Sequence, residues 1–297
     1  MKHHFKASWI VAAGFLAAVL LSGHVSGRTL DQIRAKGVLR HLGVPYANFV
    51  TGSGDGMDVE LVRLFAWHIG VEYRYVKSSW PEVIGHMTGT KVRAQEEEIE
   101  ILEQVPVKGD LIANGFTILP WRKKIVAYST PVFPTQVWVL AGSANRIDPI
   151  RPSSSIDRDI SMVKALLKEQ TILGVANTCL DPDLYHIEQT GARVKLFTSN
   201  LNQLAPALIK GEADLTLLDV PDALIALNKW PGRLKVIGPV SRPQEMGVAF
   251  PKTAHELRAE FNRFFDVCRK NGTFLRLVKK YYPGVFDYYP DFFQKKP

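Results

Sequence analysis

The first part of the chain alternates between short apolar runs and a stretch with helical spacing. Val38–Gly43 is predicted to be a first strand, and Val71–Val76 alternates as a half-buried strand does. Between them, Asp58–Ile69 repeats its apolar residues at helical spacing and stops at Gly70. Strand, helix and strand in this order predict a parallel crossover unit.

The alternation continues to the C-terminus and predicts a chain built from α/β units. We predict further strands at Leu111–Ala113, Gln136–Leu140, Thr171–Val175, Val194–Phe197, Asp214–Leu218, Leu234–Ile237 and Gly247–Phe250. We predict helices at Trp80–Met87, Pro182–Gln189, Leu201–Lys210, Val220–Lys229 and Thr273–Tyr281, with one more ending at Asn271. The spacing of Asn200 with Gln203, and of Thr253 with Glu256, predicts two capping boxes.

Two stretches do not fit a regular unit. Thr90–Val107 is polar and rich in glutamate, and its scattered apolar residues favour a solvated helix with one apolar stripe. Asn145–Ser155 is a polar loop that contains prolines, which makes it the candidate boundary between two lobes.

The N-terminus has the order of a secretory signal. Lys2 and Lys6 precede the apolar stretch 9–21, which is too short to span a bilayer, and small residues lead up to Gly27. His24 stands where a lipoprotein signal would have cysteine. We therefore expect a soluble, exported, periplasmic protein, cleaved near Gly27 and without a lipid anchor.

Composition argues against several other classes of protein. The net charge of +8 is spread along the chain and does not predict nucleic-acid binding. The 8 histidines are scattered and no metal-binding motif occurs, so we expect no metal and no cofactor. The glycine cluster 52–56 lacks the spacing of a dinucleotide-binding loop. Cys179 and Cys268 are the only cysteines, and their predicted positions in a loop and in a late helix favour the interpretation that both are free thiols. An oxidising compartment would permit a disulfide bond between them.

Polar side chains follow three of the predicted strands. Thr117 and Arg122 come after Leu111–Ala113, Thr178 comes after the Thr171 strand, and Asp219 comes after the Asp214 strand. Ligands of open α/β sheets lie beyond such strand ends, and the arginine fork binds a carboxylate at two points. We therefore predict that Arg122 and Thr178 bind a carboxylate and that Asp219 binds an ammonium group, which together describe a zwitterion.

Each of these residues also has an ordinary structural interpretation. Arg122 could be a surface arginine beside Lys123 and Lys124. Asp219 could be a plain helix N-cap, and the Thr178 hydroxyl could bond the backbone of its own turn.

Several motifs in a fixed order resemble one known family. Gly56–Leu61 is similar to G-F-D-V-D-L, Gly115–Arg122 to G-x-T-I-T-P-E-R, and Val126–Pro131 to V-D-F-S-x-P. Met246–Lys252 and Asn271–Thr273 extend the match toward the C-terminus. The set resembles the extracytoplasmic solute-binding proteins of family 3, which serve polar amino-acid uptake, over nearly all of the chain after the signal segment.

The resemblance implies an α/β, two-lobed type II periplasmic binding fold, with parallel-sheet lobes joined by two hinge strands. It implies that residues 28–138 and 243–297 form lobe 1 and residues 139–242 form lobe 2. It places the Gly115 carbonyl and Thr117 at the ligand amino group, and it places Tyr46 and Trp80 as aromatic walls. Core packing is the alternative for both rings.

The function implied by the resemblance is capture of an amino acid or similar carboxylate for an inner-membrane ABC permease. On this basis we expect a monomer that is not an enzyme. The alternatives are a free-standing sensory or regulatory binding protein, and a dehydratase-type enzyme whose acid or base would be Asp181, Asp219 or Glu82. Three features depart from the family pattern: Leu119 replaces a threonine, Asn177 replaces a glycine, and residues 90–107 form an insert.

Overall fold

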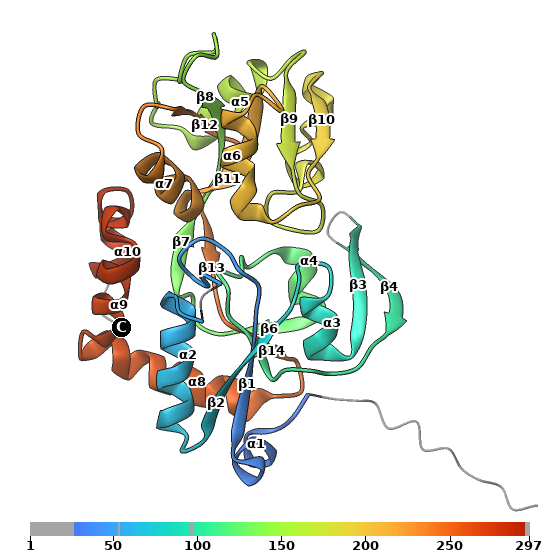
Figure 1. The fold of residues 1–297 in the computed structure, drawn as a ribbon, viewed down its shortest axis with the longest axis vertical. Helices are drawn as coiled ribbons and strands as arrows, with labels where there is room; N and C mark the ends of the chain where they lie inside the picture. The colour runs from blue at the N-terminus through green and yellow to red at the C-terminus, as the bar shows by residue number, and fades with distance from the viewer. Residues whose placement is uncertain (1–26, 53, 96–97, 295–297) are drawn as a thin grey trace, which may run out of the picture.

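The computed structural model describes residues 27–52, 54–95 and 98–294. The predicted signal segment therefore lies outside the described residues, except for Gly27. Two five-stranded sheets lie one above the other in Figure 1, with helices packed around each. No helix in the described part of the chain combines the length and the apolar character needed to cross a membrane.

The first sheet has the strand order β2-β1-β5-β14-β6. β1 pairs in parallel with β2 and β5, whereas β14 runs antiparallel to β5 and β6, so the sheet is mixed. Its strands are β1 Val38–Gly43, β2 Glu72–Lys77, β5 Leu111–Ile112, β6 Val126–Tyr128 and β14 Ala249–Pro251. The helices of this half are α1 Leu30–Lys36, α2 Met57–His68, α3 Val83–Thr88, α4 Pro120–Lys123, α8 His255–Lys270 and α9 Thr273–Tyr281.

The parallel crossover predicted at the start of the chain is confirmed. α2 connects β1 to β2, and the two strands run in register from Val38 opposite Glu72 to Gly43 opposite Lys77. The buried face of α2 carries Phe65, whose ring packs 5.2 Å from that of Phe261 on α8. Apolar residues at helical spacing thus bury α2 between the sheet and the C-terminal helices.

The second sheet has the strand order β10-β9-β11-β8-β12. β9 runs parallel to β10 and β11, and β8 runs antiparallel to β11 and β12. Its strands are β8 Val137–Gly142, β9 Thr171–Gly174, β10 Arg193–Leu196, β11 Leu215–Asp219 and β12 Leu234–Pro239. Its helices are α5 Ile156–Ala165, α6 Leu204–Ile209 and α7 Val220–Lys229.

Two short strands connect the sheets. β7 Phe133–Thr135 and β13 Gln244–Met246 pair antiparallel in the waist of the molecule (Figure 1). This arrangement is the two-lobed type II fold with its pair of hinge strands. The exact division of the chain at residues 138/139 and 242/243 stays a prediction.

The helix predicted over Thr90–Val107 is wrong. The segment forms an antiparallel hairpin of β3 Thr90–Gln95 and β4 Glu98–Gln104. β3 carries basic residues and β4 carries acidic ones, so that Lys91 pairs with Glu103 and Arg93 with Glu100 across the strands. The apolar residues of this segment were interpreted as the stripe of a helix, but they belong to two strands whose charges are complementary.

Smaller predictions also differ from the structure at helix ends. The single helix expected over Pro182–Gln189 is two 3-10 turns, η1 Pro182–Tyr185 and η2 Glu188–Thr190, because His186 between them has a left-handed backbone with φ 53°. The N-cap of α8 is Ala254 without a side-chain cap, so the capping box at Thr253 is wrong. The Asn200 side chain caps η3 Leu201–Gln203, but through the N–H of Asn202. Both cysteines are buried and free, as expected.

Asp110 fixes the start of the described chain to the first sheet. This fully buried carboxylate accepts hydrogen bonds from the Arg40 backbone N–H at 2.7 Å, from Arg40 Nη2 at 2.8 Å and from Arg28 Nε at 2.8 Å. Burial alone would raise its pKa, but the bonds from Arg28 and Arg40 hold the pKa of Asp110 below its usual value.

We expect Asp110→Asn to lower the free energy of unfolding at pH 7 by about 2 kcal/mol, since it removes charge-assisted bonds from a buried acceptor. The folded-state pKa lies below the unfolded value of about 3.9, so this stabilisation is present above that value and is lost as the pH falls through the folded pKa. Urea unfolding at pH 7 and pH 3 measures both effects. Asp157→Asn, at an exposed pair with Arg242, is the matched control and should leave stability unchanged. Equal effects of the two substitutions would contradict this account.

Candidate functional site

Arg122 is the buried cation of the space between the lobes. It lies in the short helix α4, which follows β5 and begins with Pro120 at its first turn. Only 1% of Arg122 is exposed. Its Nη1 donates to the Thr117 carbonyl at 3.0 Å and its Nη2 donates to the Asn177 carbonyl at 3.4 Å. The interpretation of Arg122 as a surface arginine is therefore excluded.

Aromatic rings hold the guanidinium of Arg122. Its central carbon lies 4.1 Å from the ring centroid of Phe116, 5.2 Å from that of Trp121 and 6.0 Å from that of Trp80. Its Nε has no hydrogen-bond partner, and none of the ion pairs among the described residues includes Arg122. The site thus holds a buried positive charge, and the Nε–H donor of that guanidinium has no acceptor among the described residues.

The loop before α4 presents Thr117 and Gly115. The Thr117 hydroxyl is buried and makes no well-aligned hydrogen bond in the described chain, although it lies near enough to the Cys179 thiol to lower the pKa of that thiol. Gly115 has φ +64°, and a Cβ there would lie 2.4 Å from the Phe49 ring, so this position requires glycine. Its N–H donates to Asp58 Oδ2 at 2.7 Å. Burial raises the pKa of Asp58 to about 7, although the bond from Gly115 opposes the shift.

Asp219 is the buried acid of the site. It ends β11 and caps α7, where its Oδ1 accepts from the N–H of Asp222 at 3.3 Å. The residue is fully buried, and burial raises its pKa to about 6. The Cys179 thiol lies 3.8 Å from its Oδ2. The N-cap interpretation is therefore correct, and the second carboxylate oxygen, Oδ2, accepts from the Cys179 thiol and not from the helix.

Thr178 has a different role from the predicted one. Its hydroxyl donates to the Val175 carbonyl at 2.7 Å and accepts from the Leu180 N–H at 3.0 Å, which closes its own turn. The backbone N–H groups of Thr178 and Cys179 have no acceptor among the described residues. In this loop the main chain, and not the hydroxyl, offers donors to a ligand.

The two predicted aromatic walls contact each other. Tyr46 is 1% exposed, and its ring meets that of Trp80 edge-on at 5.6 Å. The Tyr46 hydroxyl forms no hydrogen bond of acceptable geometry, but it lies near enough to Asp219 to lower the pKa of that carboxyl. Trp80 in turn stacks over Phe116 at 6.4 Å. Both rings thus belong to the same cluster as Arg122.

The structure brings in residues that the sequence did not single out. The buried Cys179 thiol lies 3.8 Å from Asp219 Oδ2, and burial, with a smaller effect of the Asp219 charge, raises its pKa to about 12 although Arg122 opposes the shift. The side chain of Asn177 accepts from the N–H of Ala94 at 2.9 Å, which connects the second lobe to the β3–β4 hairpin. Both residues are neighbours of Thr178 in the sequence. The departure of Asn177 from the family pattern was therefore the sequence feature that could have drawn attention to them.

The candidates for acid–base chemistry are not equivalent. Asp181 accepts from the N–H groups of Asn177 and Asp183, which fixes the loop. Glu82 pairs with Lys91 at 2.8 Å, and its pKa is lowered mainly by that bond. Of the three, only Asp219 belongs to the Arg122 cluster. In the described residues no group of histidine, cysteine, aspartate or glutamate could hold a metal ion.

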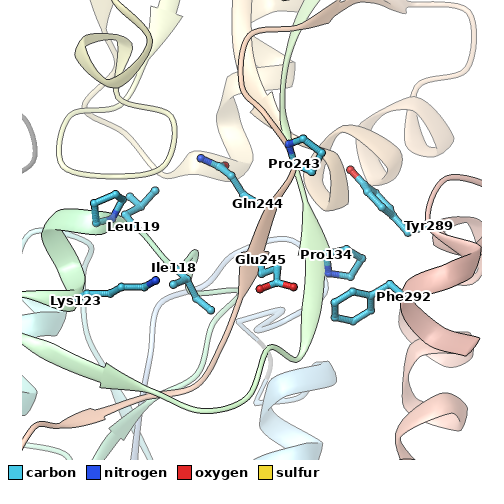
Figure 2. Close-up of a pocket in the computed structure, with 10 residues that line it drawn as sticks. Ile118, Leu119, Lys123, Pro134, Pro243, Gln244, Glu245, Tyr289 and Phe292 are labelled. Carbon is cyan, nitrogen blue, oxygen red and sulfur yellow. The ribbon is translucent and has the colours of Figure 1, made fainter. Parts of the chain in front are cut away.

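Figure 2 shows a cavity on the hinge side of the Arg122 loop. It measures about 480 Å³ and is bordered by Ile118 and Leu119, by Gln244 and Glu245 of β13, and by the aromatic residues Tyr289 and Phe292. Leu119, which replaces the family threonine, therefore lines the hinge cavity.

The comparisons with known proteins agree with the fold and identify the family. A model of the family described as bacterial extracellular solute-binding proteins, family 3, matches residues 99–284, more than half of the chain. Among solved structures, a mutant of ArgBP from T. maritima has a TM-score of 0.68 at 23% identity and covers 86% of this chain and 99% of that one. Tv2483 bound to L-arginine also has a TM-score of 0.68, at 18% identity, over 87% and 96%. At these identities the likeness shows the fold alone.

The curated relatives are named as enzymes. The membrane-bound lytic murein transglycosylase F of Desulfosudis oleivorans is 25% identical over 236 residues, which are 78% of this chain and 46% of that protein. The protein of the same name from Pseudomonas savastanoi pv. phaseolicola is 23% identical over 285 residues, or 94% and 52%. The chain spans about half the length of the curated relatives it matches.

The expectation that the chain is not an enzyme is contradicted by these names. A further structural neighbour, an ancestral amino acid-binding protein called AncCDT-1, is described as a precursor of cyclohexadienyl dehydratase; its TM-score is 0.64 at 22% identity, over 85% of this chain and 98% of that one. Enzymes thus occur both among the sequence relatives and in the lineage of a neighbour. By its sequence motifs, its two-lobed fold and the match of residues 99–284, the chain belongs to the bacterial extracellular solute-binding proteins, family 3.

Proposed function

We propose that the chain captures an amino-acid-like solute between its two lobes, with Arg122 binding the carboxylate of that solute. The observation that carries this proposal is a buried guanidinium without an anionic partner in the described chain. Such a charge is unfavourable unless it is paired, so the site favours an anionic group. The N–H groups of Thr178 and Cys179 are the additional donors to that carboxylate.

The other end of the ligand faces acceptors. Asp219 binds its ammonium group, assisted by the Gly115 carbonyl and the Thr117 hydroxyl. Tyr46 and Trp80 enclose the rest of the ligand. Opposite charges that are buried in one site and do not pair with each other favour a zwitterion over an anion or a cation alone.

The biological role that follows is solute capture outside the cytoplasm. In this role the chain is exported to the periplasm, its signal peptide is removed near Gly27, and as a monomer it presents the solute to an inner-membrane ABC permease. Closure of the lobes on the ligand is the change that the permease recognises. Membership of family 3 supports this role.

A second candidate function follows from the names of the curated relatives. The match covers 94% of this chain but 52% of the Pseudomonas savastanoi protein, so this chain corresponds to about half of a lytic murein transglycosylase F. In this candidate, solute binding by the chain serves murein cleavage. Release of soluble fragments from purified murein by the protein would support it, and bound solute returned unchanged with no such release would favour transport.

We expect Arg122→Ala and Arg122→Met to weaken amino-acid binding by about 100-fold or more, because two charge-assisted bonds are lost. Since the guanidinium has no anionic partner in the described chain, Arg122→Met should not destabilise the ligand-free protein. Calorimetry against an amino-acid panel and thermal unfolding measure the two effects.

Arg242→Ala is the matched control, because this arginine is exposed and pairs with Asp157. It should bind as the wild type does. If Arg122→Met binds as tightly as Arg242→Ala, or if no carboxylate in the panel binds, the site is assigned incorrectly.

We expect the affinity for an amino acid to fall as the pH is lowered through about 6. Burial raises the pKa of Asp219 to about 6, and the protonated carboxyl cannot pair with an ammonium group. From pH 7.5 to pH 5 the affinity should drop about tenfold, by proton linkage. Asp219→Asn should bind more weakly and show a flat profile over this range. A wild-type affinity independent of pH would contradict the contact between Asp219 and the ammonium group.

A further inference from the structure

A cavity of about 450 Å³ lies next to the Arg122 cluster, between the lobes. The first lobe contributes Val44, Ser79, Trp80 and Pro81 to its wall, and the second contributes residues 175–177 and 196–200. Two residues of the cavity wall also contact Arg122. The Trp80 ring lies over its guanidinium, and the Asn177 carbonyl accepts a hydrogen bond from its Nη2. The cavity therefore continues the proposed ligand site.

The buried part of the wall of this cavity is mainly apolar, and polar side chains occur among its exposed residues. Val44 is buried, and Trp80, Val175, Asn177 and Phe197 are half-buried. The exposed lining residues are the apolar Pro81, Ala176 and Leu196 and the polar Ser79, Thr198, Ser199 and Asn200. This arrangement matches sites that bury an apolar group and leave polar contacts at the edge.

None of the residues that line the cavity has an ionisable side chain. A cationic or anionic side chain of a ligand would lose its hydration there without gaining a counter-charge, which is unfavourable. The volume lies within the roughly 300–1,000 Å³ of small-molecule sites, so a group of aromatic size can enter.

From this we infer that the ligand is an amino acid with a large, uncharged, apolar side chain, which Trp80 and Phe197 enclose. The inference rests on the proposed function, because Arg122 and Asp219 must hold the two ends of the same ligand. It separates this chain from its neighbours of known structure, several of which are described as bound to arginine.

The test is calorimetry of the wild type with L-phenylalanine, L-alanine, L-arginine and L-glutamate. We expect L-phenylalanine to bind at least tenfold more tightly than each of the other three. Phe197→Ala and Trp80→Ala should reduce the preference for L-phenylalanine over L-alanine toward unity, whereas both amino acids still bind through their charged ends. Trp67→Ala, at a tryptophan that is 81% exposed on α2, is the matched control and should keep the full preference.

The outcomes separate the two claims. If L-arginine or L-glutamate binds more tightly than L-phenylalanine, this inference is wrong and the proposed function stands. If none of the four amino acids binds, the proposed function is wrong and the inference is wrong with it. If both cavity variants keep the preference while thermal unfolding shows them folded, the cavity does not hold the side chain.

Discussion

The positive charge of Arg122 is the constraint on which the rest of the site depends. A guanidinium that is 1% exposed needs acceptors and polarisable neighbours, and it finds one carbonyl in each half of the molecule. Thr117 belongs to the loop after β5, and Asn177 belongs to the loop after β9. The charge is therefore solvated by both lobes at once. The bond to the Asn177 carbonyl is the one of these two that crosses between the lobes, and the bond to the Thr117 carbonyl stays within the first lobe.

Asn177 connects two features of the sequence that looked unrelated. Its φ of 61° is a backbone conformation that glycine adopts freely and asparagine tolerates. In return the amide side chain accepts from Ala94 N–H in the β3–β4 hairpin, the carbonyl accepts from Arg122, and the N–H donates to Asp181. Asn177 thus connects the Arg122 loop of the site with the β3–β4 hairpin. A further hydrogen bond joins the two halves of the molecule, from the Ala47 N–H to Asn202 Oδ1 at 2.9 Å.

Local sequence patterns were sufficient to predict those features that depend on a single helix or strand. The α2 crossover and the cap of α7 by Asp219 follow from periodicity and from a capping side chain, both of which are local. The hairpin was missed because its stability comes from pairs such as Arg93 with Glu100 across two strands, which helical spacing cannot reveal. The role of the Thr178 hydroxyl was missed because a hydroxyl near a site and a hydroxyl in a turn look the same in one dimension. Cys179 was missed because its position between Asp219 and Arg122 exists only after both lobes have folded.

The separation of Arg122 from Asp219 determines what the site can bind. Both groups are buried, yet no ion pair in the described chain joins them, and the Cys179 thiol that lies 3.8 Å from Asp219 Oδ2 also feels the charge of Arg122. If the two charges met directly, each would satisfy the other and the site would be electrically neutral toward solutes. Because the two charges do not pair with each other, each end of the site retains its own field. A ligand with one charge would meet only one of these fields, and it would leave the opposite charge buried and unpaired. A molecule that carries both charges at a short fixed separation would satisfy both ends at once, which is why we propose an amino-acid backbone before any side chain is considered.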